Sequence, residues 1–138
     1  MSDIDWRIWI YDKLRNYTAF IDLVPEARIF GAGSLVGVPE KPFVVIHVGN
    51  EFREGPGLSR TTGTIWAHDD TGNFLLIDSI LSEVRNALCG MGESIGWVTG
   101  PGGIACQWDN DGPDQSDQGY GTLMRSTQYQ LLGRNGNA

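Results

Sequence analysis

Residues 61–89 constrain the fold most, because they predict one strand that runs directly into one amphipathic helix. β-branched and aromatic residues dominate positions 61–68, and such residues favour a pleated, half-buried strand. Residues 69–73 combine turn-forming residues with a glycine, so we expect a turn there, with Asn73 capping the helix and Gly90 ending it. Apolar residues then recur at three- and four-residue spacing: Phe74, Ile77, Ile80, Leu81, Val84 and Leu88. Such a stripe must cover a surface, and the sheet that contains residues 61–68 is the expected partner.

The length and charge of the chain limit its architecture and its partners. Its 138 residues suit a single domain that buries a core without needing disulfides or metals. The formal charge of -7 argues against a site that grips duplex DNA, because such sites use Lys and Arg to neutralise phosphates. Residues 1–10 are acidic where a secretory signal is positive, and no run approaches the roughly 20 apolar residues of a membrane span. We therefore expect synthesis and retention in a cytosol.

The N-terminal segment predicts another helix, from a cap at Ser2 or Asp3 to about Phe20. Its larger apolar face consists of Trp6, Ile10, Leu14, Tyr17 and Ile21. Charged residues separate this face from a smaller apolar strip, which consists of Ile4, Ile8 and Tyr11. Two interpretations of the strip stay open: it packs into the core of the same domain, or it contacts a neighbouring subunit, as exposed apolar strips often do.

Four further segments predict strands, and glycine-rich or polar stretches separate them. The expected strands are residues 28–30, 43–48, 104–108 and 122–132. Residues 43–48 (FVVIHV) are continuously apolar apart from one histidine, which predicts a central strand covered on both faces. Residues 49–60 are polar, glycine-rich and too long for a tight hairpin, so we expect a projecting loop there. Residues 90–103 predict an irregular segment, and residues 109–121 an acidic loop.

The acidic segment is the best local candidate for chemistry, because clustered carboxylates can ligate calcium. Its carboxylates are Asp109, Asp111, Asp114 and Asp117. The spacing does not match an EF-hand: counted from Asp109, the positions that require glycine and glutamate hold Asp114 and Tyr120. We therefore expect a solvated turn rather than a metal site.

The remaining candidate side chains lack the partners that catalysis requires. His47 and His68 lie in or at the end of a strand, with no Ser, Cys or carboxylate partner at an identifiable spacing. Two cysteines, Cys89 and Cys106, provide neither a disulfide framework nor a metal cage, and we expect reduced core thiols. Three tryptophans could line a ligand pocket, but such residues more often fill a core or a subunit boundary: Trp66, Trp97 and Trp108. The sequence thus predicts no enzyme, no cofactor and no metal.

The order of these elements, together with two sequence runs, resembles a known protein family. The runs are WAHDD at residues 66–70, entering the helix at 74–90, and DQGYGTLMRSTQY at residues 117–129. They resemble the tail terminator proteins of long-tailed bacteriophages, particularly those of actinobacterial hosts. The likeness covers most of the chain, with residues 31–37 and 90–103 matching least well.

The resemblance implies an α+β subunit in which two α-helices pack on a mainly antiparallel sheet. It implies a virion protein that is assembled in the host cytoplasm as a homo-oligomer, a hexameric ring. Such a ring caps the tube of the major tail tube protein, stops its growth and joins it to the head-side connector. DNA would pass through an acidic lumen without specific binding.

A ring needs two different contact patches on each subunit, and two segments are our candidates for assembly contacts. We expect the subunit interface to include Ile4, Ile8 and Tyr11. We expect contact with the tube or the lumen from Glu51, Phe52, Arg53 and Arg60. Two alternatives stay open: a head-side neck or connector subunit, and a cytosolic module that binds a small ligand or a metal.

Overall fold

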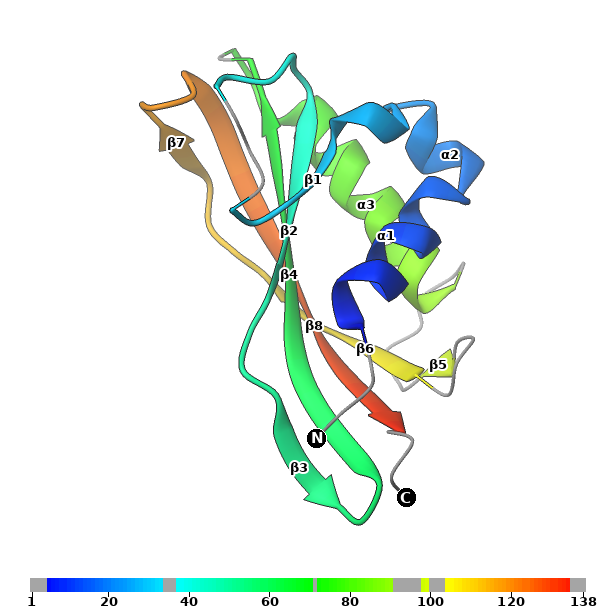
Figure 1. The fold of residues 1–138 in the computed structure, drawn as a ribbon. Helices are drawn as coiled ribbons and strands as arrows, with labels where there is room; N and C mark the ends of the chain where they lie inside the picture. Colours follow the sequence, from blue (N-terminus) through cyan, green and yellow to red (C-terminus); the bar gives the residue numbers. More distant parts are fainter. Residues whose placement is uncertain (1–4, 34–36, 71, 91–97, 100–103, 135–138) are drawn as a thin grey trace.

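A computed structural model describes residues 5–33, 37–70, 72–90, 98–99 and 104–134. These residues form an α+β fold in which one mainly antiparallel sheet carries its helices on one face, as Figure 1 shows. The strand order is β1-β2-β4-β8-β6-β5, with β3 and β7 pairing at the margins. The strands are β1 (Ile29–Gly31), β2 (Phe43–Val48), β3 (Phe52–Gly55), β4 (Leu58–Asp69), β5 (Val98–Thr99), β6 (Ile104–Asp111), β7 (Gln115–Asp117) and β8 (Thr122–Arg134). The predicted fold class is confirmed.

Strand β4 is the centre of the sheet, as its β-branched composition predicts. It pairs antiparallel with β2 on one side and with β8 on the other, so Ile65 lies between Ile46 and Thr127. Strand β1 begins one residue later than expected and runs parallel to β2. Alternation along β8 turns Tyr129 and Leu131 toward the helices, where both are buried.

Helix α3 (Leu75–Cys89) lays its predicted stripe on the sheet. The buried residues are Ile77, Ile80, Leu81, Val84, Leu88 and Cys89. Gly90, with a φ of 84°, ends the helix as predicted. The cap position is Phe74 rather than Asn73, so the helix begins one residue later than expected, although the Asn73 side chain accepts a hydrogen bond from the Leu75 backbone N–H at 2.9 Å.

The N-terminal helix is shorter than the sequence predicts. Helix α1 (Trp6–Arg15) begins at the cap Asp5, which accepts a hydrogen bond from the Ile8 N–H, and a separate one-turn helix α2 (Thr18–Ile21) follows. The prediction of one helix to Phe20 is wrong because the Asn16 side chain donates to the Asp12 carbonyl and the chain leaves helical geometry at that point. The proposed caps Ser2 and Asp3 lie outside the described residues.

Three segments that were predicted as loops or as irregular contain strands. Residues 49–60 include β3, which pairs with the beginning of β4 around Pro56 and Gly57, so the expected loop is a hairpin. The loop prediction is wrong because β4 begins at Leu58, three residues before its β-branched run. This early part of β4 pairs with the polar strand β3. Residues 109–121 likewise contain the end of β6 and all of β7, which pairs with β8. The segment 90–103 contains β5.

The face of β2 that points away from the helices is covered only at the start of the strand, where Phe43 is buried against His68 and Tyr120, which corrects the expectation for residues 43–48. Val44 and Ile46 are buried beneath the helices, whereas His47 on the opposite face is exposed and Val45 is half-buried. Helices α1, α2 and α3 all lie on the same side of the sheet in Figure 1. The other face therefore carries no helix from the described part of the chain.

Candidate assembly surfaces

The predicted strip on α1 borders a hollow beside the sheet edge. This hollow, of about 270 Å³, is lined by Arg7, Ile8, Tyr11, Ile29, Gly31 and Ile46. The side chain of Ile8 is 56% exposed, although an isoleucine on an amphipathic helix is ordinarily buried. Tyr11 donates its hydroxyl to Glu26 at 3.0 Å, and this bond raises the pKa of the phenol. Ile4 lies outside the described residues.

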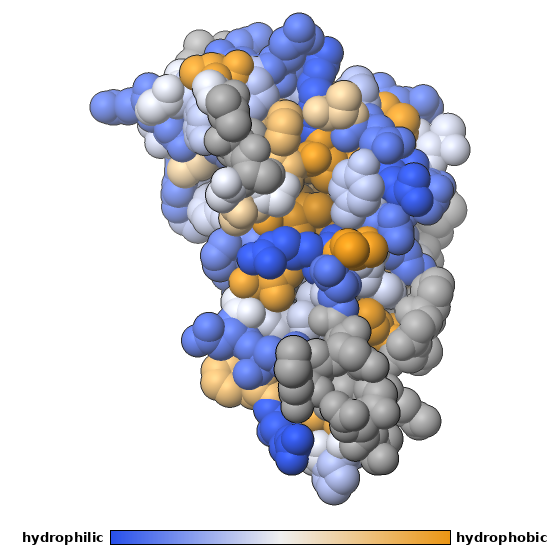
Figure 2. All heavy atoms as spheres, viewed as in Figure 1, coloured by the Kyte–Doolittle hydropathy of each residue, from blue (hydrophilic) through white to orange (hydrophobic). Residues whose placement is uncertain are grey.

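Apolar surface is visible in this region of the molecule. Figure 2, in the same view as Figure 1, shows hydrophobic residues exposed around β1 and α1 with hydrophilic residues among them. A polar rim around a small apolar centre is the usual anatomy of a protein–protein contact. The arrangement thus suits a second protein better than a small polar ligand.

The second predicted group lies on the β3–β4 hairpin, which extends beyond the helices at one end of the sheet in Figure 1. Phe52 is 62% exposed and sits opposite Arg60 in the strand register. Arg60 pairs with Glu54 at 2.6 Å, while Glu51 accepts a hydrogen bond from the Trp6 indole. The structure therefore brings Phe52 and Arg60 together and ties Glu51 to α1. Arg53 is exposed on the same short strand.

The uncovered sheet face is a third surface, which the sequence analysis did not identify. A hollow of about 470 Å³ is lined there by His47, Gly49, Thr62, Thr64, Trp66 and Gln128. A neighbouring hollow of about 300 Å³ shares Trp66 and includes Val45 and Met124. The larger hollow contains no Asp, Glu, Lys or Arg, in a chain with 27 such residues by its counts of 10 basic and 17 acidic. Depletion of charge around a tryptophan, as at Trp66 in the larger hollow, is typical of a contact that another protein covers.

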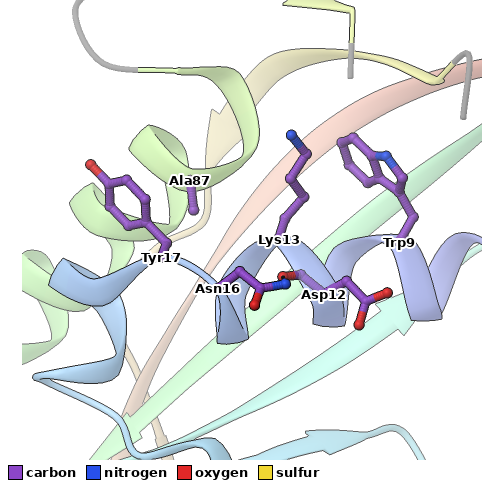
Figure 3. A pocket seen from close by; sticks show the side chains of 6 residues that line it. All are labelled: Trp9, Asp12, Lys13, Asn16, Tyr17 and Ala87. Atoms are coloured by element: carbon purple, nitrogen blue, oxygen red, sulfur yellow. Dashed lines mark hydrogen bonds between the residues drawn. The ribbon is translucent and has the colours of Figure 1, made fainter. Parts of the chain in front are cut away.

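A fourth hollow separates α1 from α3 on the helical side. It has a volume of about 390 Å³ and is lined by Trp9, Asp12, Lys13, Asn16, Tyr17 and Ala87. Figure 3 shows Lys13 alongside Trp9, with the ammonium 5.6 Å from the indole ring centre, and Tyr17 near Ala87. This cation–π contact occupies one end of the hollow.

The acidic segment uses its carboxylates within the fold. Asp111 accepts hydrogen bonds from Thr127 at 2.7 Å and from the Trp108 indole at 3.1 Å, and pairs with Arg85 at 3.3 Å. Asp114 pairs with Arg125, which also contacts Asp78. Across the described residues, no three His, Cys, Asp or Glu side chains are grouped so that they could hold a metal ion. The carboxylates therefore fix β6 and β7 to their neighbours.

The two histidines lie in different environments. His68 is buried, stacks on Phe43 with ring centres 4.5 Å apart, and places Nδ1 2.9 Å from the Thr122 hydroxyl. Burial lowers the pKa of His68, and the charge of Asp117 opposes this shift in part. His47 is exposed and lines the larger sheet-face hollow.

The tryptophans are likewise divided. Trp66 lies half-buried on the uncovered face, whereas Trp108 lies under the Arg85 guanidinium, 4.0 Å from the ring centre. Trp97 lies outside the described residues. Trp9, which the sequence analysis left off the apolar face of the first helix, is buried together with Trp6.

Cys89 and Cys106 are free and buried, as predicted. Within the described residues, no helix is long and apolar enough to cross a bilayer.

The fold has counterparts among solved structures. Nineteen chains match it, among them a chain of the "Virion of native gene transfer agent (GTA) particle". That match has a TM-score of 0.62 and 13% sequence identity, and it covers 91% of this chain and 92% of the other. At this identity the likeness concerns the fold. No known family model and no curated protein sequence matches this chain.

Proposed function

We propose that this protein is a structural component of a phage-like virion, and that within the virion it forms the ring that terminates the tail tube. The observation that carries the proposal is the near end-to-end likeness of its fold to a chain of a virion particle. The likeness includes almost the whole of both chains, so the compared units are of similar extent. A phage-like particle also gives the exposed apolar surfaces of this subunit a use, because assembly would cover them.

The surfaces of the subunit fit a ring. Ring closure requires a heterologous interface, in which two different patches of neighbouring copies meet. We assign one patch to the α1 hollow with Ile8 and Tyr11, together with Ile4, which the sequence pattern groups with them. We assign the other to the uncovered sheet face around Trp66, which is free of charged side chains at its centre. Six copies are the expected number, from the resemblance to tail terminators.

The projecting hairpin is assigned to the tube or to the lumen. Phe52 offers an exposed apolar side chain to the major tail tube protein, and Arg53 and Arg60 offer charge at the margin of the contact. The opposite side of the ring would receive the head-side connector. The net charge of -7 would disfavour adhesion of DNA that passes through the lumen.

The roles that remain as alternatives predict different partners. A head-side neck subunit would also form a ring but would bind the connector and ignore the tube. A cytosolic module for a small ligand or metal would bind neither. The proposed role is structural and not enzymatic, because the surfaces of the subunit would act by binding other proteins.

Binding to tail tubes tests the proposal. Purified protein is incubated with tubes of the major tail tube protein, and the mixture is examined by cosedimentation and negative-stain imaging. We expect rings at tube ends and an arrest of tube growth. Binding to connectors but not to tubes would favour the neck role, and a monomer that binds neither would contradict a virion role.

A paired variant assigns the tube contact to the hairpin. Phe52→Ser combined with Arg53→Glu should reduce tube binding at least about tenfold, because interface anchors commonly contribute 2 kcal/mol or more, by the rough scale of alanine scans. Leu75→Ser is the matched control, since Leu75 is 72% exposed at the start of α3, outside the hairpin. Equal loss in both variants would remove the hairpin from the tube interface.

A further inference from the structure

The only two cysteines of the chain meet in the core. Cys89 is the last residue of α3, and Cys106 lies in β6. Their sulfur atoms are 3.8 Å apart, and the two residues are 1% and 0% exposed. Because the chain has two cysteines in all, no other intrachain pairing competes.

The positions of the two residues suit a covalent bond. A disulfide requires sulfur atoms about 2.05 Å apart, so the present separation must shorten by less than 2 Å, within reach of side-chain rotation and a small backbone adjustment. Cys89 is at a helix end, followed by Gly90 with a φ of 84°, so no further helical turn restrains it. Cys106 is fixed by pairing of β6 with β8 opposite Leu131. Cys106 is thus held in place by the sheet, and Cys89 can move toward it.

We propose that Cys89 and Cys106 form an intrachain disulfide when the folded protein meets a peroxide, and that this bond fastens α3 to β6. The inference concerns the subunit itself and does not depend on the proposed ring. Cys89 and Cys106, which the sequence predicts only as reduced core thiols, would thereby be a site of oxidative modification.

The chemistry balances with hydrogen peroxide as the oxidant. Cys89, as thiolate, attacks one peroxide oxygen; the O–O bond breaks, and the leaving hydroxide takes a proton to become water. Cys106 then attacks the sulfur of the Cys89 sulfenic acid, the S–O bond breaks, and a second water leaves. Two thiols and one peroxide become one disulfide and two waters.

The surroundings indicate which sulfur reacts first. The hydrogen bond from Cys106, together with the Trp108 backbone N–H, lowers the pKa of Cys89 although burial opposes the shift. The same thiol pair and burial raise the pKa of Cys106. Cys89 is therefore the nucleophile and Cys106 the resolving thiol.

The experiment compares reduced and oxidised protein of the full chain. Reduced protein is treated with hydrogen peroxide, then analysed by intact mass, by non-reducing peptide mapping and by thermal melting. We expect an intact mass lower by two hydrogen atoms and a peptide that links Cys89 to Cys106. The melting temperature should rise by about 6 to 12 °C, because the bond closes a loop between residues 17 apart, and dithiothreitol should reverse the rise.

Two results would overturn the inference. One is a mass increase from added oxygen atoms with no linked peptide, and the other is a linked peptide whose formation leaves the melting temperature unchanged or lower. Cys89→Ala and Cys106→Ala serve as controls, and each should abolish the peroxide-dependent rise. Because the wild-type comparison with and without dithiothreitol needs no variant, the test survives if either substitution prevents folding.

Discussion

His68 makes the stability of the fold dependent on pH through a single buried ring. It packs between Phe43 and Tyr120, with ring centres 4.5 and 5.7 Å away, and Thr122 meets its Nδ1. Burial lowers its pKa in the folded state, so the unfolded chain takes up the proton more readily. The stability that neutral His68 contributes to the fold is fully present above the pKa of the unfolded state, about 6.5. It is lost as the pH falls below that value toward the lowered pKa of the folded state.

We therefore expect the free energy of unfolding to fall between about pH 7 and about pH 5, by at most about 1.4 kcal/mol per pH unit from this one group. Urea melts across this range measure the slope. His68→Phe should flatten this slope. An unchanged slope in His68→Phe would show that other groups produce the pH dependence.

Leu81 tests whether the apolar stripe of α3 supplies stability at the position where the structure puts it. The side chain is 4% exposed within the core, so Leu81→Ala should cost roughly 2 to 5 kcal/mol by leaving a cavity. Leu75→Ala is a matched control in the same helix, because Leu75 is 72% exposed and its truncation should stay within about 0.5 kcal/mol. Denaturant melts compare the two, and equal losses would contradict the assigned orientation of the helix.

At the scale of elements, α1 approaches β4 so closely that one glycine sets their separation. A Cβ atom added at Gly63 would lie 3.0 Å from Ile10 Cδ1 and 3.2 Å from Leu131 Cδ1. Gly63 also sits opposite Val48 and Tyr129 in the sheet, so the strand cannot shift aside without loss of register. The small residue thus permits the helix to lie on the sheet.

Gly63→Val should accordingly cost about 1 to 3 kcal/mol by overpacking. Ile10→Ala, which removes the side chain that comes nearest, should cost less in the Gly63→Val background than in the wild type. A double-mutant cycle by urea denaturation measures this coupling. Additive losses would mean that α1 is free to move away from β4.

Elements with a strong period were predictable, and features that depend on pairing with another segment or on a single side chain were not. The stripe of α3 and the alternation of β8 follow from residues within each segment. Strand β3, by contrast, has a polar sequence and exists because the early part of β4 pairs with it. The end of α1 depends on one side chain, Asn16, whose bond to the Asp12 carbonyl competes with helix continuation.

The candidate surfaces show the same division. Ile8 was recognisable from helical spacing, and its exposure accords with the interpretation of a strip that its own core does not cover. The uncovered sheet face was not recognisable, because the alternation that identifies a half-buried strand does not reveal what covers its other side. Val45 was expected in a strand covered on both faces, and Trp66 in a core or a subunit boundary. Both line a hollow on that face.

At the scale of the whole molecule, the subunit has apolar surface on its helical edge and on its open sheet face, and a second copy can join them. An interface of this kind forms rings when the rotation between copies closes. The affinity of such an interface depends on a few central residues. A charge buried among them without a partner is strongly unfavourable. Ile8, exposed beside the α1 hollow, is the side chain best placed to test this.

Ile8→Asp should weaken self-assembly at least about tenfold while leaving the melting temperature of the subunit nearly unchanged, because the new charge is solvated in the free subunit and would be buried in the proposed ring. Size-exclusion chromatography with light scattering at several concentrations measures the shift. Leu75→Asp is the matched control: it places the same charge on another exposed aliphatic position, 72% against 56% for Ile8, in the first turn of α3, where an acidic residue suits the helix dipole. An Ile8→Asp protein with wild-type assembly and a lowered melting temperature would assign Ile8 to the core of its own subunit and remove α1 from the interface.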